Sequence, residues 1–227
     1  MKFIALIPAR KGSKRIKGKN IKRLNKKPLI YYTIKQSLAC SFIKRTIVLT
    51  DCKKIKKIAE KFGAEVPFLR PNSISKDKTD MLSTVNYCMS KLNFKNSFIQ
   101  KLAIVLLPPT SPLRDVKDIN NACLKFKENK NVDSLVTTYK IKEYYHPSKI
   151  MYENNNFLKR MSYDNRKTFY VRNGPAILIT KAKRLKRYIL GGKILNFVMP
   201  RSRSIDINYL SDFNKVEKIL KLKKNKI

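Results

Sequence analysis

Cysteine and histidine are scarce in this sequence and too scattered to form a metal or disulfide framework. The four cysteines, Cys40, Cys52, Cys88 and Cys123, contain no CxxC pair, and His146 is the single histidine. Zinc sites need closely spaced Cys and His ligands, and disulfide-stabilised domains need many paired cysteines. The sequence therefore indicates neither kind of framework, and we expect a reducing compartment.

Long hydrophobic runs are also missing. The first apolar stretch, within MKFIALIPARKG, contains about five apolar residues beside basic ones. That is shorter than the apolar core of a signal peptide and much shorter than a membrane-spanning helix. We therefore expect a soluble, cytoplasmic protein with no membrane partner.

Acidic residues are few: 15 Asp and Glu stand against 52 Lys and Arg, for a formal net charge of +37. Such an excess ordinarily suggests a nucleic-acid or membrane-surface partner. Here lysine is spread along the whole chain beside Asn and Ile, as an AT-rich coding sequence would produce, and is not gathered into one basic tail or face. We therefore do not expect nucleic acid as a partner, although a basic nucleic-acid-binding protein stays open as the alternative from a different functional class.

The pattern of apolar residues predicts an α/β fold. A chain of 227 residues with 43% hydrophobic content can bury one core, so we expect a single domain over residues 1–227. Short β-forming runs alternate with stretches of helical period, which is typical of βαβ units around a mostly parallel sheet flanked by helices. The predicted strands are Phe3–Ile7, Thr46–Leu49, Glu65–Phe68, Ala103–Leu107, Ser134–Tyr139, Pro175–Thr180 and Leu195–Met199. The predicted helices are Leu29–Cys40, Lys53–Phe62, Met81–Leu92, Val116–Lys127 and Leu210–Leu222.

Helix ends and one irregular segment complete this prediction. Asp51, Asp80, Asp115 and Ser211 are predicted N-caps, and Gly63 is a predicted C-terminal stop. Residues 140–172 lack a clean period and are too long for a plain connection, so we expect an excursion that folds against a second subunit. His146, directly before a proline, is interpreted as structural rather than catalytic.

A basic loop with two glycines follows the first predicted strand. Residues 7–20, IPARKGSKRIKGKN, contain Gly12 and Gly18 among six basic side chains: Arg10, Lys11, Lys14, Arg15, Lys17 and Lys19. A glycine-containing turn at the carboxyl end of a strand lets backbone N–H groups approach phosphates, and basic side chains neutralise the charge. Neither GxxxxGK[ST] nor GxGxxG fits the spacing. The loop therefore predicts a triphosphate-binding site of another type.

The order of residues in this loop resembles a known family. Residues 7–34, IPARKGSKRIKGKNIKRLNKKPLIYYTI, are similar to the opening of the acylneuraminate cytidylyltransferases, whose pattern is ARxGSKGxxxKNxxxLxGKPL. Arg15 stands where that family usually has glycine. The resemblance implies that the phosphates and base of CTP are held by Arg10, Gly12, Ser13, Lys14, Lys19 and Asn20.

Three further stretches occur in the family's order. IVLTDC at residues 47–52 resembles IVSTD, VPFLRP at 66–71 resembles VxxLRP, and LLPPTSPLR at 106–114 resembles LLQPTSPLR. By this resemblance Arg70 faces the nucleotide.

The last of these stretches is expected to contact the sugar. Thr110, Ser111 and Arg114 come directly after a predicted central strand, where open α/β sheets bind ligands. Pro108 stands where many family members have a glutamine that touches the sugar. The identity of the sugar acid therefore stays open.

Two stretches around the excursion also resemble the family. YYHPSK at residues 144–149 is similar to HHPLK, and YVRNGPAILIT at 170–180 is similar to RNGAIYI. The resemblance implies that Lys149, Arg172 and Asn173 bind the sugar, whose carboxylate requires a cation.

A candidate metal site lies before the last helix. SIDINYLSDF at residues 204–213 resembles SIDIDxxxD, in which two carboxylates hold Mg²⁺ against the triphosphate. Asp206 matches the first, whereas Asn208 at the second offers a neutral carbonyl oxygen and no charge. We expect Mg²⁺ at Asp206 and Asn208 with weakened affinity, and Asp212 in the first helical turn.

The resemblance implies a Rossmann-like nucleotide-diphospho-sugar transferase fold and a homodimer. The implied reaction joins CMP from CTP to a nonulosonic, sialic-acid-like sugar acid and releases pyrophosphate. Arg10, Lys14, Lys19 and Asp206, with Mg²⁺, would stabilise the developing charge. Legionaminic acid and an eight-carbon ulosonic acid stay open as the sugar, and Asn208 leaves open an inactive relative.

Overall fold

A seven-stranded sheet forms the centre of the fold in the computed structural model, which describes residues 1–76, 79–172, 174 and 176–224. Six strands follow the order β11-β6-β10-β5-β1-β4, and β9 pairs with β6. Their bounds are β1 (Lys2–Pro8), β4 (Ile43–Leu49), β5 (Leu102–Leu106), β6 (Ser134–Lys140), β9 (Tyr170–Val171), β10 (Leu178–Lys181) and β11 (Ile194–Val198). β1 is parallel to β4 and β5, and β6 is parallel to β11, whereas β10 runs antiparallel to β5 and β6. The mostly parallel α/β sheet predicted from the sequence is confirmed.

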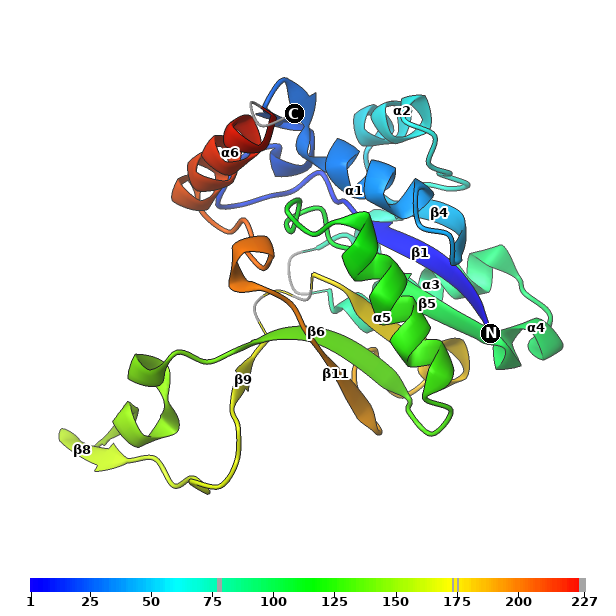
Figure 1. The fold of residues 1–227 in the computed structure, drawn as a ribbon. Coiled ribbons are helices and arrows are strands. Elements are labelled where there is room, and N and C mark those ends of the chain that lie inside the picture. Colours follow the sequence, from blue (N-terminus) through cyan, green and yellow to red (C-terminus); the bar gives the residue numbers. More distant parts are fainter. Residues whose placement is uncertain (77–78, 173, 175, 225–227) are drawn as a thin grey trace.

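Helices cover both faces of this sheet (Figure 1). On one face lie α1 (Leu29–Leu38), α2 (Lys53–Lys61) and α5 (Val116–Glu128), and on the other lie α3 (Met81–Leu92) and α4 (Asn96–Gln100). Successive side chains of a strand point to opposite faces, so Phe3, Ala5 and Ile7 enter the first core. Ile4 and Leu6 enter the second. Both faces of β1 are thus buried, which explains its continuous apolar run.

A third, smaller core attaches the last helix to the basic loop. α6 (Leu210–Lys224) contributes Phe213 and Val216, which pack with Ile16 of the loop and with Ile207. Figure 1 shows α6 beside the N-terminal segment. This packing ties the last helix to the loop that follows the carboxyl end of β1.

Most predicted elements are present within one or two residues of their expected ends, but one strand is absent. Glu65–Phe68 forms only an isolated bridge between Glu65 and Ile47, because its backbone pairs with β4 for a single residue before turning away. Pro175, the first residue of another predicted strand, lies outside the described residues. The stop at Gly63 is confirmed by its φ of +95°.

Two of the four predicted N-caps are confirmed. Asp80 accepts a hydrogen bond from the backbone N–H of Ser83, and Asp115 forms a capping box with Asp118. Asp51 is not a cap, because α2 begins after Cys52 and Asp51 accepts from the backbone of another loop. Ser211 is not a cap either, since α6 already begins at Leu210.

Residues 140–172 leave the sheet as an arm (Figure 1). The arm contains two 3₁₀ turns, Glu143–Tyr145 and Pro147–Lys149, and a hairpin of β7 (Met151–Asn154) and β8 (Phe157–Arg160). The hairpin was not predicted, although Asn155 and Asn156, both at positive φ, are typical of a two-residue turn. A second short hairpin, β2 (Arg23–Leu24) with β3 (Lys27–Pro28), was also missed.

The arm exposes many large apolar side chains. They are Tyr144, Tyr145, Ile150, Met151, Tyr152, Phe157, Leu158, Met161, Tyr163 and Tyr170. In the part of the chain that the structure describes, no helix has the length and apolar content needed to cross a membrane.

Candidate functional site

A cavity of about 560 Å³ opens at the carboxyl ends of β1 and β5. This is the edge at which open α/β sheets bind ligands. Its described lining contains six basic side chains and no acidic one. The lining residues are Pro8, Arg10, Ser13, Lys14, Arg15, Ile16, Lys19, Asn20, Arg70, Ile74, Lys76, Thr79, Met81, Thr84, Pro108, Pro109, Thr110 and Asn208. The arrangement suits a polyanionic ligand.

The basic loop is held in place at both of its ends. Near its start the backbone N–H of Lys11 donates to Asp51 at 2.7 Å, and further on the amide of Asn20 donates to the carbonyl oxygen of Arg10 at 3.0 Å. Asn20, predicted to hold CTP, is therefore also the residue that closes the loop on itself. Gly12 is exposed and lies outside the lining, and a Cβ there would meet no atom within 4 Å.

Lys19 joins this loop to the segment before α6. Its ammonium donates to the carbonyl oxygen of Ile207 at 2.8 Å. Burial lowers the pKa of Lys19 below its usual 10.5, and nearby Asp206 works in the opposite direction. A half-buried ammonium with donors left over is well suited to meet a phosphate oxygen.

Arg70 is a buried basic side chain of the cavity. It is 7% exposed, and its Nη1 donates to the hydroxyl of Thr84 at 3.3 Å. Within the described residues its Nε and Nη2 donate to nothing. Burial lowers the pKa of Arg70, an effect that Asp51 opposes and Arg10 reinforces. Since buried donors are almost always paired, an orphaned guanidinium in a basic cavity points to an anionic ligand.

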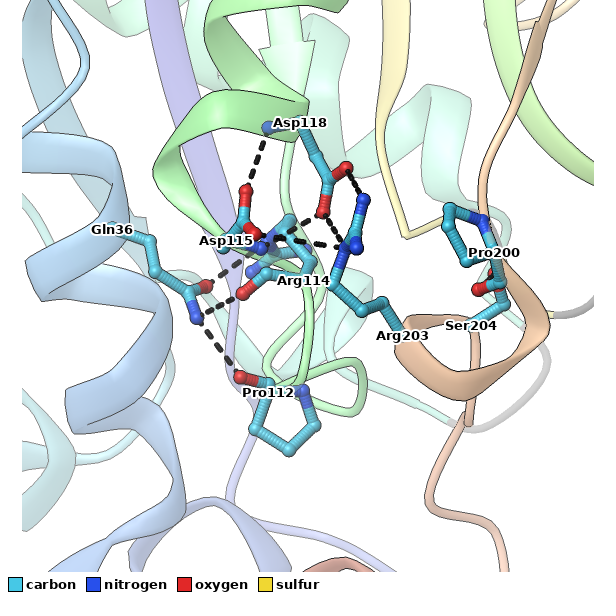
Figure 2. Close-up of polar contacts among 8 residues, drawn as sticks. All are labelled: Gln36, Pro112, Arg114, Asp115, Asp118, Pro200, Arg203 and Ser204. Carbon is cyan, nitrogen blue, oxygen red and sulfur yellow. Dashed lines mark hydrogen bonds and ion pairs between the residues drawn. The ribbon is translucent and has the colours of Figure 1, made fainter. Parts of the chain in front are cut away.

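Arg114, expected in the crevice, is instead a buried support for the loop after β5. It is 1% exposed, its Nη2 donates to Thr33 at 2.7 Å, and its guanidinium also donates to the carbonyl oxygens of Pro108 and Ala176. Burial lowers its pKa to about 9, with Asp118 opposing the shift. Figure 2 shows Gln36 bonded to the backbone of Arg114 and Pro112. These bonds fix the loop that carries Thr110.

An ion pair anchors the segment that leads to the candidate metal site (Figure 2). Arg203 donates from Nε and Nη2 to the two carboxylate oxygens of Asp118, at 2.9 and 2.7 Å. This two-point contact ties the turn Arg201–Arg203 to the start of α5 and raises the pKa of Arg203. It was not predicted, because Asp118 is 85 residues away from Arg203 in the sequence.

The predicted metal ligands form a chain of contacts beside the cavity. Asn208 donates from Nδ2 to Asp206 at 2.8 Å, and its Oδ1 accepts from Arg15 at 3.3 Å. Asp206 also accepts from the buried hydroxyl of Ser111, at 3.5 Å. A Cβ on Gly174, whose φ is +32°, would lie 2.4 Å from the Asp206 carboxylate. Asp212, as expected, lies in the first turn of α6, where it accepts from two backbone N–H groups.

These residues fit a magnesium site with one carboxylate. Mg²⁺ is often held by one or two carboxylates, several waters and the phosphates of a substrate, and Asp206 can provide the first of these. Among the described residues, no group of three or more His, Cys, Asp and Glu side chains could hold a metal ion. The oxygen of Asn208 is directed to Arg15.

The predicted sugar-binding residues divide between the cavity and the arm. Thr110 lines the cavity and Ser111 lies buried behind it. Lys149 pairs with Glu143 at 3.1 Å on the arm, and neither Lys149 nor Arg172 belongs to the lining. Asn173 lies outside the described residues. His146 caps the turn Pro147–Lys149, which agrees with its structural interpretation.

Several lining residues had no sequence signal. Ile74, Lys76, Thr79, Met81 and Thr84 enter the cavity from the loop before α3 and from its first turns. The sequence predicted only the helix Met81–Leu92 and its N-cap Asp80 in this region, and these indicate a helix rather than a site.

Comparison with known proteins agrees with this geometry. Residues 4–227 match the family model described as cytidylyltransferase. A CMP-N,N'-diacetyllegionaminic acid synthase of Legionella pneumophila is 40% identical over 122 residues, covering 54% of this chain and 52% of that protein. An N-acylneuraminate cytidylyltransferase of Escherichia coli is 30% identical over 93% of this chain and 50% of that protein. This chain thus spans about half the length of these two relatives.

A third relative and a solved structure match over nearly their whole length. A pseudaminic acid cytidylyltransferase of Campylobacter jejuni is 28% identical, covering 93% of each chain. The structure of a CMP:2-keto-3-deoxy-manno-octonic acid synthetase complexed with CTP has a TM-score of 0.73 at 17% identity, covering 98% of this chain and 100% of that one. The structural match confirms the predicted nucleotide-sugar transferase fold, and the family model shows that this chain belongs to the cytidylyltransferase family.

Proposed function

We propose that the chain transfers CMP from CTP to a nonulosonic, sialic-acid-like sugar acid and releases pyrophosphate. The observation that carries the proposal is the orphaned guanidinium of Arg70 inside a cavity with six basic lining residues. A triphosphate would supply the missing acceptors. Family membership and the cavity's place at the carboxyl ends of the strands support the same conclusion.

In the proposed reaction the anomeric hydroxyl oxygen of the sugar acid attacks the α-phosphorus of CTP. A new oxygen–phosphorus bond forms, the bond to the bridging oxygen of the β-phosphate breaks, and the hydroxyl proton passes to water. Arg10, Lys14 and Lys19 stabilise the charge that develops on pyrophosphate, while Ser13, Asn20 and the backbone near Gly12 hold the nucleotide. Catalysis here rests on positioning and charge, with no covalent intermediate on the protein.

We propose Mg²⁺ as the cofactor, held by Asp206 together with phosphate oxygens. Bound there, it would neutralise negative charge on the triphosphate. The amide oxygen of Asn208, the predicted second ligand, accepts a hydrogen bond from Arg15.

We propose a class of sugar acids, the nonulosonic acids, as the substrate and do not assign one member of it. The relatives' names include N-acylneuraminate, N,N'-diacetyllegionaminic acid and pseudaminic acid. Thr110 and Ser111 are the proposed sugar contacts of this protomer. Pro108 and Pro109 line the same side of the cavity and offer no side-chain donor, which favours an apolar substituent of the sugar at that wall.

We propose a homodimer in which the arm completes the partner's site. Lys149 and Arg172, the proposed cations for the sugar carboxylate, lie outside this protomer's own cavity, as does the arm's run of exposed apolar side chains. A second copy that covers the arm would bury those side chains and bring the cations to a cavity. We also propose a cytoplasmic location, supported by the four cysteines, all described and all free thiols.

One assay tests the reaction. The protein is incubated with Mg²⁺, each of CTP, UTP, ATP and GTP, and a panel of N-acetylneuraminic, legionaminic, pseudaminic and eight-carbon ulosonic acids, and pyrophosphate is measured. We expect release with CTP and at least one nonulosonic acid, and loss of release in Arg70→Met. No release with any acid would sink the proposal, and release with the eight-carbon acid alone would reassign the substrate.

A further inference from the structure

Two positions at which this chain departs from the family pattern contact each other. Arg15 replaces the usual glycine and Asn208 replaces the usual aspartate, and they are 193 residues apart in sequence. In the fold the Nη1 of Arg15 lies 3.3 Å from the Oδ1 of Asn208. The guanidinium also lies 5.0 Å from the ring centre of Tyr209.

The chemistry of the contacts fixes how the Asn208 amide is oriented. A guanidinium can only donate and an ionised carboxylate can only accept, so the amide oxygen faces Arg15 and the amide nitrogen faces Asp206. An aspartate at position 208 would instead bring a second negative charge next to Asp206. The chain therefore has a positive charge linked to Asp206 where the family pattern has an additional negative one.

These two substitutions change the charge of the ligands that the site attracts. A cation near Asp206 repels Mg²⁺ and attracts phosphate, and Lys19 already contributes one positive charge close to the same carboxylate. Mg²⁺ affinity falls with each anionic ligand removed, whereas Arg holds phosphate without any metal.

We propose that Arg15, linked to Asp206 through Asn208, binds the phosphates of the nucleotide. Its guanidinium supplies part of the positive charge that Mg²⁺ would otherwise provide. CTP then binds with little help from Mg²⁺, and Mg²⁺ is held weakly by Asp206 and the bound phosphates. Asn208 is a positioning residue that orients Arg15. The inference rests on the proposed function, since it takes CTP as the ligand.

The first experiment measures CTP binding by calorimetry, without the sugar acid, in EDTA and in Mg²⁺. For the unmodified chain we expect the two dissociation constants to agree within about threefold. Arg15→Gln should weaken binding in EDTA about tenfold, or ~1.4 kcal/mol, and make binding depend more strongly on Mg²⁺. The control is Lys17→Gln, which removes an exposed charge of the same loop outside the cavity lining. Equal affinity of the two variants would overturn the inference while leaving the proposed function intact.

The second experiment measures Mn²⁺ binding by electron paramagnetic resonance, with no nucleotide present. Asn208→Asp alone should change Mn²⁺ affinity by less than about threefold, because Arg15 would pair with the new carboxylate. The double variant Arg15→Gln with Asn208→Asp should bind Mn²⁺ at least about tenfold more tightly. A full gain from Asn208→Asp alone would overturn the inference. Absence of CTP binding by the unmodified chain in either buffer would overturn the proposed function and this inference with it.

Discussion

The ammonium of Lys19 donates a hydrogen bond to the carbonyl oxygen of Ile207 at 2.8 Å. This bond joins the loop after the first strand to the segment before the last helix, and it holds Lys19 within the field of Asp206. Two stretches from opposite ends of the sequence thus form one wall of the cavity, and their joint geometry can be tested through the charge of Lys19.

We expect CTP affinity to fall as pH rises into the alkaline range. Burial lowers the pKa of Lys19, so its ammonium loses its proton at a pH where ordinary lysines, with a pKa near 10.5, are still charged. The protonated form binds phosphate, so affinity is highest below the lowered pKa and decreases above it. Lys19→Arg keeps the charge, because the guanidinium pKa exceeds about 12, and should move the decrease to higher pH. Calorimetry between about pH 7 and 10 measures how CTP affinity depends on pH. Lys17→Arg is the control. If the unmodified chain and both variants gave the same pH profile, Lys19 would not be the group whose charge binds the phosphate.

Arg70→Met should weaken CTP binding without weakening the fold. Among the described residues, two of the three guanidinium nitrogens of Arg70 have no partner although the side chain is only 7% exposed. Burying this charge therefore lowers the stability of the fold, and a single hydrogen bond offsets little of that cost. We expect at least about a tenfold loss of CTP affinity, ~1.4 kcal/mol, and an unfolding free energy in urea that is unchanged or higher.

The matched control for Arg70 is Arg114→Met. Arg114 is also buried, but its guanidinium donates to carbonyl, hydroxyl and amide oxygens. Its loss leaves those acceptors unpaired and should lower the unfolding free energy by roughly 3 kcal/mol or more. Similar stability losses in both variants would show that Arg70 serves the fold rather than a ligand.

Gly174→Ala should displace Asp206. The new Cβ would lie 2.4 Å from the carboxylate, and the φ of +32° is unfavourable for any residue with a side chain. We expect an unfolding free energy lower by about 1–3 kcal/mol and a clear loss of pyrophosphate release. Gly12→Ala, whose Cβ would meet no atom within 4 Å, should change the unfolding free energy by less than about 0.5 kcal/mol. If Gly174→Ala kept its activity, the position of Asp206 would not matter for the reaction.

The arm should act across a dimer interface. Phe157 and Leu158 are 73% and 67% exposed at the hairpin, so Phe157→Glu with Leu158→Glu should yield folded monomers in sedimentation analysis. These monomers should still bind CTP, because the arm lies outside the cavity lining. A chain that sediments as a monomer before any substitution would refute the dimer.

Exchange of subunits tests the same interface through activity. Lys19→Met and Arg172→Ala should each be inactive alone. When the two variants are dissociated and mixed, about half of the dimers contain one subunit of each kind, and one of the two sites in such a dimer has both Lys19 and Arg172. Activity should therefore return at about a quarter of all sites. Failure of the mixture to recover activity would place Arg172 in its own protomer's site.

Elements with a clear local signal were predictable. The buried strands β1 and β5 show unbroken apolar runs, and Asp80 and Asp115 mark their helices through caps that involve only the next few residues. Glu65–Phe68 has Glu65 and Pro67 beside its apolar residues, and its pairing with β4 ends after one residue. Strand formation depends on the partner strand, which a single run of residues does not specify.

The candidate site likewise contains features that the sequence predicted and features that it did not. The sequence by itself determined the α/β class, the basic loop and the resemblance of that loop to the cytidylyltransferases, because these depend on the order of residues within short stretches. Only the tertiary structure decided that Arg114 supports the loop, that Arg70 keeps unpaired donors in the cavity, and that Arg15 meets Asn208. Such contacts join residues up to 193 positions apart, and burial and pairing are set by the packing of the whole chain.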